Sequence, residues 1–127
     1  MRRLIALVFL FALLATGCGT SSQQDITAAK EYVRSLYSRS DITFTFDKVE
    51  GPEYAAVARI PWGTSGRRVD KSAACAVRVW FTWHEEGRTT HDHSIVWVTS
   101  DHKAVGWGGD PSGQDWRKYV QSLAKQS

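Results

Sequence analysis

Two strand-like runs separated by a short polar turn constrain the fold more than any other feature of this sequence. Residues 74–84 and 89–99 are rich in β-branched and aromatic side chains, and Glu85-Glu86-Gly87 separates them. A three-residue hairpin loop with glycine in its last, left-handed position fits this segment. The sequence therefore predicts one long antiparallel hairpin.

The expected loop pairs His84 with Arg88, and this register decides which side chains share a face. The more apolar face, which should meet the core, then carries Val77, Val79, Phe81, Trp83, His91, His93, Ile95 and Trp97. The opposite face carries Arg78, Trp80, Thr82 and His84 from the first strand. A shift of one residue would move both histidines to the face of Trp80 and Thr82.

The remaining periodicities predict two helices and several shorter strands. In chain order they are a helix from Asp25 or Thr27 to about Ser40, a strand over 42–47, a turn at Gly51-Pro52, a strand over 54–60, a loop over 63–72, a short strand over 103–107 and a helix that begins near Pro111, capped by Asp110 or Ser112. We therefore expect an α+β domain with an N-terminal helix, an antiparallel sheet of about four to five strands with a long hairpin, and a C-terminal helix, the helices lying on one face of the sheet.

This order of elements is similar to that of the small cystatin-like and NTF2-like domains. In those domains a helix lies in the concave face of a curved antiparallel sheet. The resemblance implies a cavity between the sheet and the first helix, and such cavities often bind ligands. It extends over most of the chain after the first 24 residues.

The first 18 residues predict export from the cytoplasm. Arg2 and Arg3 precede an apolar run from Leu4 to Ala15, and small residues follow up to Cys18. This is the layout of a secretory signal peptide. The run is shorter than the about 20 apolar residues that a membrane-spanning helix needs.

The stretch from Ala15 to Cys18 resembles the lipobox of bacterial lipoproteins. The resemblance implies a diacylglycerol thioether on Cys18, cleavage before it, and a mature protein that starts there. Because Gly19 stands where an aspartate would retain the protein in the inner membrane, it implies a cell-envelope protein on the extracytoplasmic side, in the outer membrane if the cell has one. The expected parts are a signal peptide over 1–17, the lipidated cysteine and a polar tether over 18–24, and a single domain over 25–127.

Charge and cysteine content argue against a nucleic-acid-binding protein and against a domain held together by an internal disulfide. Of the 16 basic side chains, Arg2 and Arg3 lie in the signal, so the 14 that remain face 13 acidic ones. A nucleic-acid-binding domain usually carries a strong basic surplus, so no nucleic-acid partner is expected. Once Cys18 is acylated, Cys75 is the one thiol left, so no internal disulfide can form. Its apolar neighbours predict a buried small hydrophobe rather than a reactive group.

The segment His91-Asp92-His93 is the sharpest chemical candidate. Histidines two apart in a strand point to the same side, so both imidazoles can reach one metal ion. The expected neighbours on that face supply no third ligand, and we predict neither a metal site nor a cofactor. Because the sequence has no Gly-x-Ser-x-Gly elbow and no phosphate-binding glycine loop, we predict no catalytic residues and no enzyme activity. His91 and His93 remain candidates for lining a cavity.

Six tryptophans give a separate signal. Trp80 is expected on the more polar face of the hairpin, and Trp62 precedes a glycine-rich loop with two arginines. Exposed tryptophan and arginine often mark protein contacts, but tryptophans that close sheet edges and arginines in a solvated loop give the same pattern. The candidate partner-binding residues are Trp62, Arg67, Arg68, Arg78, Trp80 and Thr82.

Together these features predict a membrane-attached module that binds an envelope or secreted protein. Two alternatives stay open. One is a small-ligand cavity domain that uses His91 and His93, and the other is an inhibitor or immunity-type lipoprotein.

Replacing Cys18 by alanine tests the expected anchor. Without this thiol no diacylglycerol can be attached, so the protein should no longer be labelled by a palmitate analogue in living cells, and its signal peptide should no longer be cleaved at this position. Cys75→Ala removes the other thiol and should keep full labelling. Labelling of Cys18→Ala at the wild-type level would contradict the lipid anchor.

Overall fold

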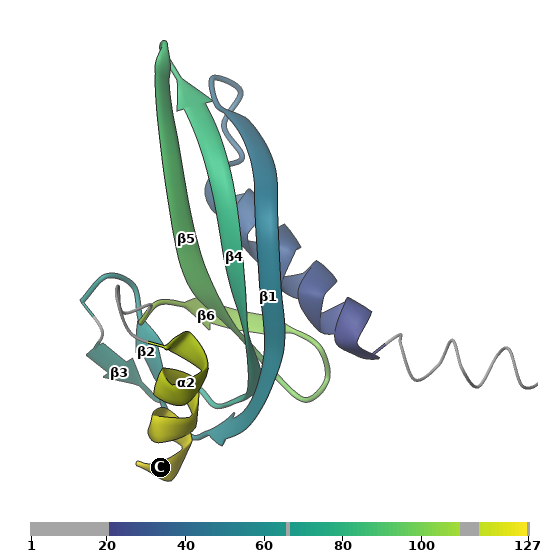
Figure 1. The fold of residues 1–127 in the computed structure, drawn as a ribbon, viewed down its shortest axis with the longest axis vertical. Helices are drawn as coiled ribbons and strands as arrows, with labels where there is room; N and C mark the ends of the chain where they lie inside the picture. Colours follow the sequence, from purple (N-terminus) through teal and green to yellow (C-terminus); the bar gives the residue numbers. More distant parts are fainter. Residues whose placement is uncertain (1–20, 66, 110–114, 127) are drawn as a thin grey trace, which may run out of the picture.

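The structure, a computed structural model, describes residues 21–65, 67–109 and 115–126. A four-stranded antiparallel sheet of order β1-β4-β5-β6 lies between two helices, and a two-stranded sheet, β2-β3, lies beside it (Figure 1). The described part of the first helix covers residues 21–36, and the other elements are β1 (Thr43–Val57), β2 (Ile60–Trp62), β3 (Arg67–Val69), β4 (Ala73–Glu85), β5 (Arg88–Val98), β6 (Ala104–Trp107) and α2 (Trp116–Lys125). The predicted α+β fold, with a helix at each end and a long hairpin, is confirmed.

Some predictions fall outside the described residues. These are the signal peptide, the lipidated Cys18 and the residues 110–112 expected to start the last helix. Within the described residues, Asp115 caps α2, because its side chain accepts a hydrogen bond of 3.0 Å from the backbone N–H of Arg117. Such a cap satisfies one of the N–H groups that a helix start leaves without a partner.

The first helix differs from its predicted boundaries at both ends. It already includes residues 21–24, where the sequence predicts a tether, and it ends at residue 36 rather than near residue 40. Ser22 Oγ lies 3.2 Å from the hydroxyl of Tyr54 in β1. Residues 21–24 therefore belong to the helix and contact the sheet, although their polar composition alone suggests a flexible tether.

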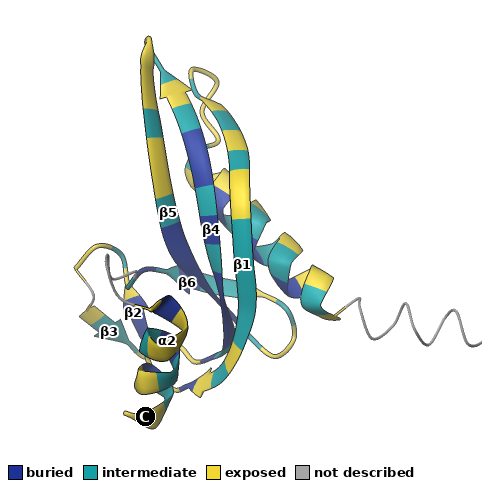
Figure 2. Cartoon of the chain, in the orientation of Figure 1, coloured by how far each residue is buried: buried dark blue, intermediate teal, exposed yellow. Residues whose placement is uncertain are grey.

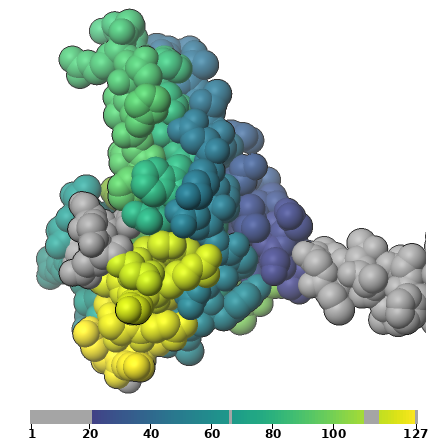
Figure 3. All heavy atoms as spheres, viewed as in Figure 1, coloured from purple at the N-terminus to yellow at the C-terminus, as the bar shows by residue number. Residues whose placement is uncertain are grey.

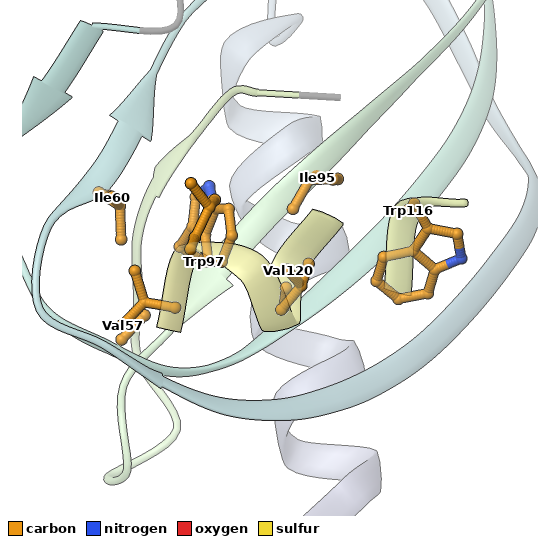
Figure 4. Packing of buried hydrophobic residues seen from close by; sticks show 9 residues of the cluster. Val57, Ile60, Ile95, Trp97, Trp116 and Val120 are labelled. Atoms are coloured by element: carbon orange, nitrogen blue, oxygen red, sulfur yellow. The ribbon is translucent and has the colours of Figure 1, made fainter. Parts of the chain in front are cut away.

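The two helices pack on opposite faces of the sheet, not on one face as predicted. The N-terminal helix contributes Ala29 and Val33 to a cluster with Val77 and Phe81 of β4. On the other face α2 closes a second cluster (Figure 4), which includes Val57, Ile60, Ile95, Trp97, Trp116, Val120 and Leu123. Residues 75–77 and 95–98 are buried without interruption (Figure 2). Strands that are apolar on both faces need a cover on each side.

The β4–β5 hairpin has a two-residue turn instead of the expected three-residue loop. Glu85 pairs with Arg88, and Glu86 and Gly87 between them have φ angles of 50° and 74°. Positive φ at both central residues is the pattern of a type I′ turn, whose twist matches that of the flanking strands. The pairing is therefore shifted by one residue from the predicted register.

This shift moves the two histidines to the opposite face of the sheet. His91 lies opposite Thr82, and His93 lies opposite Trp80. Because side chains alternate along a strand, a shift of one residue changes the face of every side chain in β5 relative to β4. The prediction that His91 and His93 share the core face with Phe81 is wrong. Of the two, His93 still borders a groove beside the N-terminal helix.

β1 runs as one strand through Gly51-Pro52, where the sequence predicts a turn between two strands. It is an edge strand that pairs with β4 alone, and edge strands tolerate proline and bulges. The register against β4 shifts three times, between Phe46 and Lys48, Glu50 and Glu53, and Tyr54 and Val57. Because of these irregularities, β1 stays paired with β4 on both sides of Gly51-Pro52, where the sequence predicts a turn.

Part of the segment over 63–72, predicted as a loop, forms β3, which pairs with β2. The small sheet is joined to the end of β6, because the N–H of Gly63 donates to the carbonyl of Trp107 at 2.8 Å. Gly108 has φ of 141°, and any side chain there would overlap the backbone of Gly63. Glycine at position 108 therefore allows the close approach of β2 to β6.

Candidate functional site

The sheet face under α2 is only partly covered. α2 has 10 residues, which corresponds to a length of about 15 Å, whereas the 13 residues of β4 extend over about 43 Å. The surface above α2 in Figure 3 is formed by β1, β4 and β5. Seven side chains from these strands interact there, and we call them the outer patch: Asp47, Glu50, Arg78, Trp80, Thr82, His91 and His93.

Trp80 lies at the centre of the outer patch and contacts three of its members. Its Nε1–H donates to Glu50 Oε1 at 2.7 Å. The guanidinium of Arg78 lies 4.7 Å from the centroid of an indole ring, and the centroids of Trp80 and His93 are 4.4 Å apart. The indole is half-buried, so it presents an aromatic surface in a fixed orientation.

The charge of Glu50 belongs to the same group of contacts. Burial by itself would raise the pKa of Glu50, but the hydrogen bond from Trp80 and the charges of Lys48 and Arg78 together bring it below the ordinary value. Arg78 lies 3.8 Å from Glu50 Oε1, and Lys48 Nζ lies 3.9 Å from it. The carboxylate is therefore ionised at neutral pH, and a charged acceptor strengthens the hydrogen bond that holds the indole.

A second row of the outer patch is a chain of hydrogen bonds across three strands. Thr82 Oγ1 lies 2.5 Å from Asp47 Oδ2 and 2.8 Å from His91 Nδ1, and Thr82 is only 6% exposed. Asp47 reaches this position because the bulge between Phe46 and Lys48 adds one residue to β1 relative to β4. Bulges commonly redirect a side chain in this way.

The donors and acceptors of this row fix the tautomer of His91. A threonine hydroxyl has one proton, and an ionised carboxylate can only accept, so Thr82 donates to Asp47. Thr82 Oγ1 then accepts from His91 Nδ1–H. In the neutral imidazole, Nε2 is consequently the nitrogen without a proton.

The hairpin register explains why these side chains are so close. The carbonyl of Ile95 accepts a hydrogen bond of 3.0 Å from the N–H of Gly108, so the backbone groups of Ile95 point away from β4. By alternation, those of His91 and His93 do the same. Their pairs with β4 are of the non-hydrogen-bonded kind, in which facing side chains approach most closely.

The structure divides the predicted partner-binding residues between two sheets. Arg78, Trp80 and Thr82 lie together in the outer patch, whereas the other three lie on β2 and β3. Trp62 is 37% exposed and Arg67 is exposed. The Nε–H of Arg68 donates to the carbonyl of Arg59 at 2.6 Å, so its guanidinium is engaged within the domain.

Glu50 is the member of the outer patch that sequence reasoning missed. Strict alternation from Phe44 and Phe46 places Glu50 on the core side and Asp47 on the open side, without any indication of a partner. The bulge in β1 reverses the alternation after Asp47 and brings both carboxylates to the same face. The sequence contains no glycine or proline at this point to signal the bulge.

A buried polar cluster lies on the side of the N-terminal helix. Asp25 is 3% exposed, and its Oδ1 lies 2.7 Å from Nδ1 of His102. Burial, with smaller contributions from the charge and the hydrogen bond of Asp25, raises the pKa of the Cys75 thiol to about 12. The prediction that Cys75 is buried is confirmed, and a thiol that stays protonated at neutral pH is a poor nucleophile.

Comparison with known proteins gives no family for this chain. No family model matches it, and neither a curated protein nor a solved structure matches it. Across the described segments, no three or more histidine, cysteine or acidic side chains are grouped so that they can hold a metal ion. In the same segments, no helix combines the length and the apolar character needed to cross a bilayer.

Thr82→Val tests the hydrogen-bond chain, with Thr82→Ser as the matched variant that keeps the hydroxyl. Valine leaves Asp47 and His91 without their common partner, so the free energy of unfolding in urea should fall by about 0.5–1.5 kcal/mol. By ¹⁵N NMR, neutral His91 should be protonated at Nδ1 in the wild type and the serine variant and should populate both tautomers in the valine variant. Protonation of wild-type His91 at Nε2 would contradict the assigned direction of these bonds.

Proposed function

We propose that this protein is a lipid-anchored binding module on the extracytoplasmic side of the cell envelope, and that it recognises an envelope or secreted protein through the outer patch. The observation that carries the proposal is the fixed, half-buried indole of Trp80 beside Arg78 on an uncovered sheet face. Tryptophan and arginine dominate the binding energy of protein interfaces. A side chain that is already held in place loses little entropy on binding.

The charges at the outer patch cancel when the neighbouring Lys48 is included, because Asp47 and Glu50 are negative and Arg78 and Lys48 are positive. Glu50 lies near Arg78 and Lys48, and Asp47 accepts a hydrogen bond from Thr82. A partner therefore meets little net charge, and we expect affinity to come from contact with the indole and from hydrogen bonds. Association should then depend weakly on salt, because long-range attraction contributes little.

The chemistry of the two candidate nucleophiles favours binding over catalysis. Thr82 donates to the carboxylate of Asp47, but it is only 6% exposed, so a substrate cannot readily reach its hydroxyl. Cys75 keeps its proton, since its pKa is about 12. Neither group is set up for nucleophilic attack, which needs an accessible nucleophile that a base or a lowered pKa activates.

The position of the first helix agrees with attachment through Cys18. The described helix includes residue 21, three positions after this cysteine, and it packs on the face of the sheet opposite the outer patch. A chain attached at Cys18 would thus carry its anchor and its binding surface on different sides of the sheet. The outer patch would stay accessible to a partner next to the membrane.

Recovery of the partner from native membranes tests the proposal. Trp80→Ala should reduce the amount of partner that co-purifies with the protein by at least about tenfold, because truncation of a central interface residue commonly costs 2 kcal/mol or more. Arg78→Ala should act in the same direction. Lys118→Ala, an exposed residue of α2, is the matched control and should leave recovery unchanged.

Circular dichroism of each variant separates loss of binding from loss of folding. Arg78→Ala keeps the indole and serves as the second test if Trp80→Ala fails to fold. Equal recovery of the same partner with folded wild-type, Trp80→Ala and Arg78→Ala proteins would contradict the role of the outer patch.

A further inference from the structure

A groove lies at the outer edge of β5, beside the N-terminal helix. Its volume is about 660 Å³, within the range of about 300–1,000 Å³ that is typical of small-molecule sites. β5 begins at Arg88, whereas β6 pairs with it only from Val96 onward. The N-terminal helix forms one wall of the groove, and the ends of β2 and β6, together with Tyr119 of α2, form the opposite wall.

The lining of the groove combines apolar surface with a single full charge. Val33 and Leu36 of the helix contribute aliphatic surface, and Trp107 and Tyr119 contribute aromatic rings. Among the described residues that line it, Asp92 is the one aspartate, glutamate, lysine or arginine. A ligand in the groove therefore meets a negative charge within a mainly uncharged surface.

The carboxylate of Asp92 is oriented by the backbone and lies close to an aromatic ring. Its Oδ1 accepts the N–H of His93 at 2.8 Å. Burial, and to a lesser extent the negative charge of Asp92, raises the pKa of Tyr37, so the phenol keeps its proton at neutral pH. Asp92 pairs with Phe81 of β4, whose ring centroid lies 5.2 Å from that of Tyr37. A carboxylate and an aromatic face both attract cations, and both line this end of the groove.

Polar and aromatic groups follow one another along the strand that borders the groove. Ser94 lies two residues from Asp92, and Trp107 pairs with Val96, two residues further. At about 3.3 Å per residue, this row spans roughly 13 Å. Ser94 is 8% exposed, and its buried hydroxyl has no hydrogen-bond partner within the described part of the chain.

From this arrangement we propose that the groove binds a small organic cation with an apolar body, the ammonium group lying beside Asp92 and Tyr37 and the body lying against Val33 and Trp107. A small anion would be repelled by the carboxylate of Asp92, and the described lining residues include no lysine or arginine to attract it. A neutral ligand would gain nothing from the charge. The groove shares only His93 with the outer patch, so this site is separate from the proposed protein-binding surface.

Titration calorimetry with two probes of nearly identical shape tests the proposal. Phenethylammonium carries a positive charge and 2-phenylethanol does not. We expect phenethylammonium to bind the purified protein at low ionic strength with a dissociation constant of roughly 1 mM, and the alcohol to bind at least tenfold more weakly. Added salt should weaken the binding of the ammonium and leave that of the alcohol unchanged.

Asp92→Asn removes the charge but keeps an amide oxygen that can accept the N–H of His93. It should weaken phenethylammonium binding at least tenfold and leave 2-phenylethanol unaffected. Glu31→Gln, an exposed carboxylate of the N-terminal helix, makes the same change of charge outside the groove and should have no effect. Asp92→Asn should leave recovery of the partner from membranes unchanged, which separates the groove from the proposed function.

Amide chemical shifts locate the bound probe. Saturable shifts should gather at residues 33–37, 92–94 and 107 and should be absent from the hairpin turn at Glu86-Gly87. Any one of three results would overturn the proposal: no saturable binding of phenethylammonium, equal binding of the two probes, or unchanged binding to Asp92→Asn.

Discussion

The two-residue turn at Glu86-Gly87 is the constraint on which the rest of the structure depends. It pairs Glu85 with Arg88 and thereby assigns a face to every side chain of β4 and β5. In this register the histidines join the outer patch in non-hydrogen-bonded pairs, and the apolar residues further along the same face meet α2. One more residue in the turn would place the histidines against the N-terminal helix, and the contacts between Trp80 and His93 and between Thr82 and His91 would not form.

The lengths of the covering elements decide which surfaces remain for binding. The central strands are apolar on both faces, so each face needs a helix, but α2 spans about a third of the length of β4. The uncovered part of that face is the outer patch. In the same way β6 pairs with only one end of β5, and the groove lies along the part of the edge beyond it. Both proposed binding surfaces therefore follow from a mismatch in length between strands and their neighbours.

The hairpin, the two helices and the apolar stripe of α2 with Trp116, Val120 and Leu123 are predictable from periodicity, because they depend on local spacing. The register is not predictable in this way. Glu85-Glu86-Gly87 is compatible with both a two-residue and a three-residue turn, and residues 95–98 are apolar on both faces, so burial does not distinguish the registers. The prediction that both helices lie on one face fails for the same reason. Strands that are buried on both sides show no alternation of apolar and polar residues, so the sequence does not indicate that each face needs a helix.

The candidate site was predictable only in part, for the same physical reasons. Arg78, Trp80 and Thr82 share a face in either register, because they belong to one strand. Their contacts with β1 and β5 depend on the bulge at Asp47 and on the hairpin turn, which are set by tertiary packing. Long-range pairing of this kind leaves no periodic signal in the sequence.

Cross-strand NMR contacts between β4 and β5 test the central claim most directly. In a non-hydrogen-bonded antiparallel pair the two Cα atoms are only about 4.5 Å apart, so the facing Hα protons give strong nuclear Overhauser effects. The structure predicts such effects between Thr82 and His91 and between Trp80 and His93. Effects that instead join His91 to Phe81 would show the three-residue loop, and the outer patch would not exist as described.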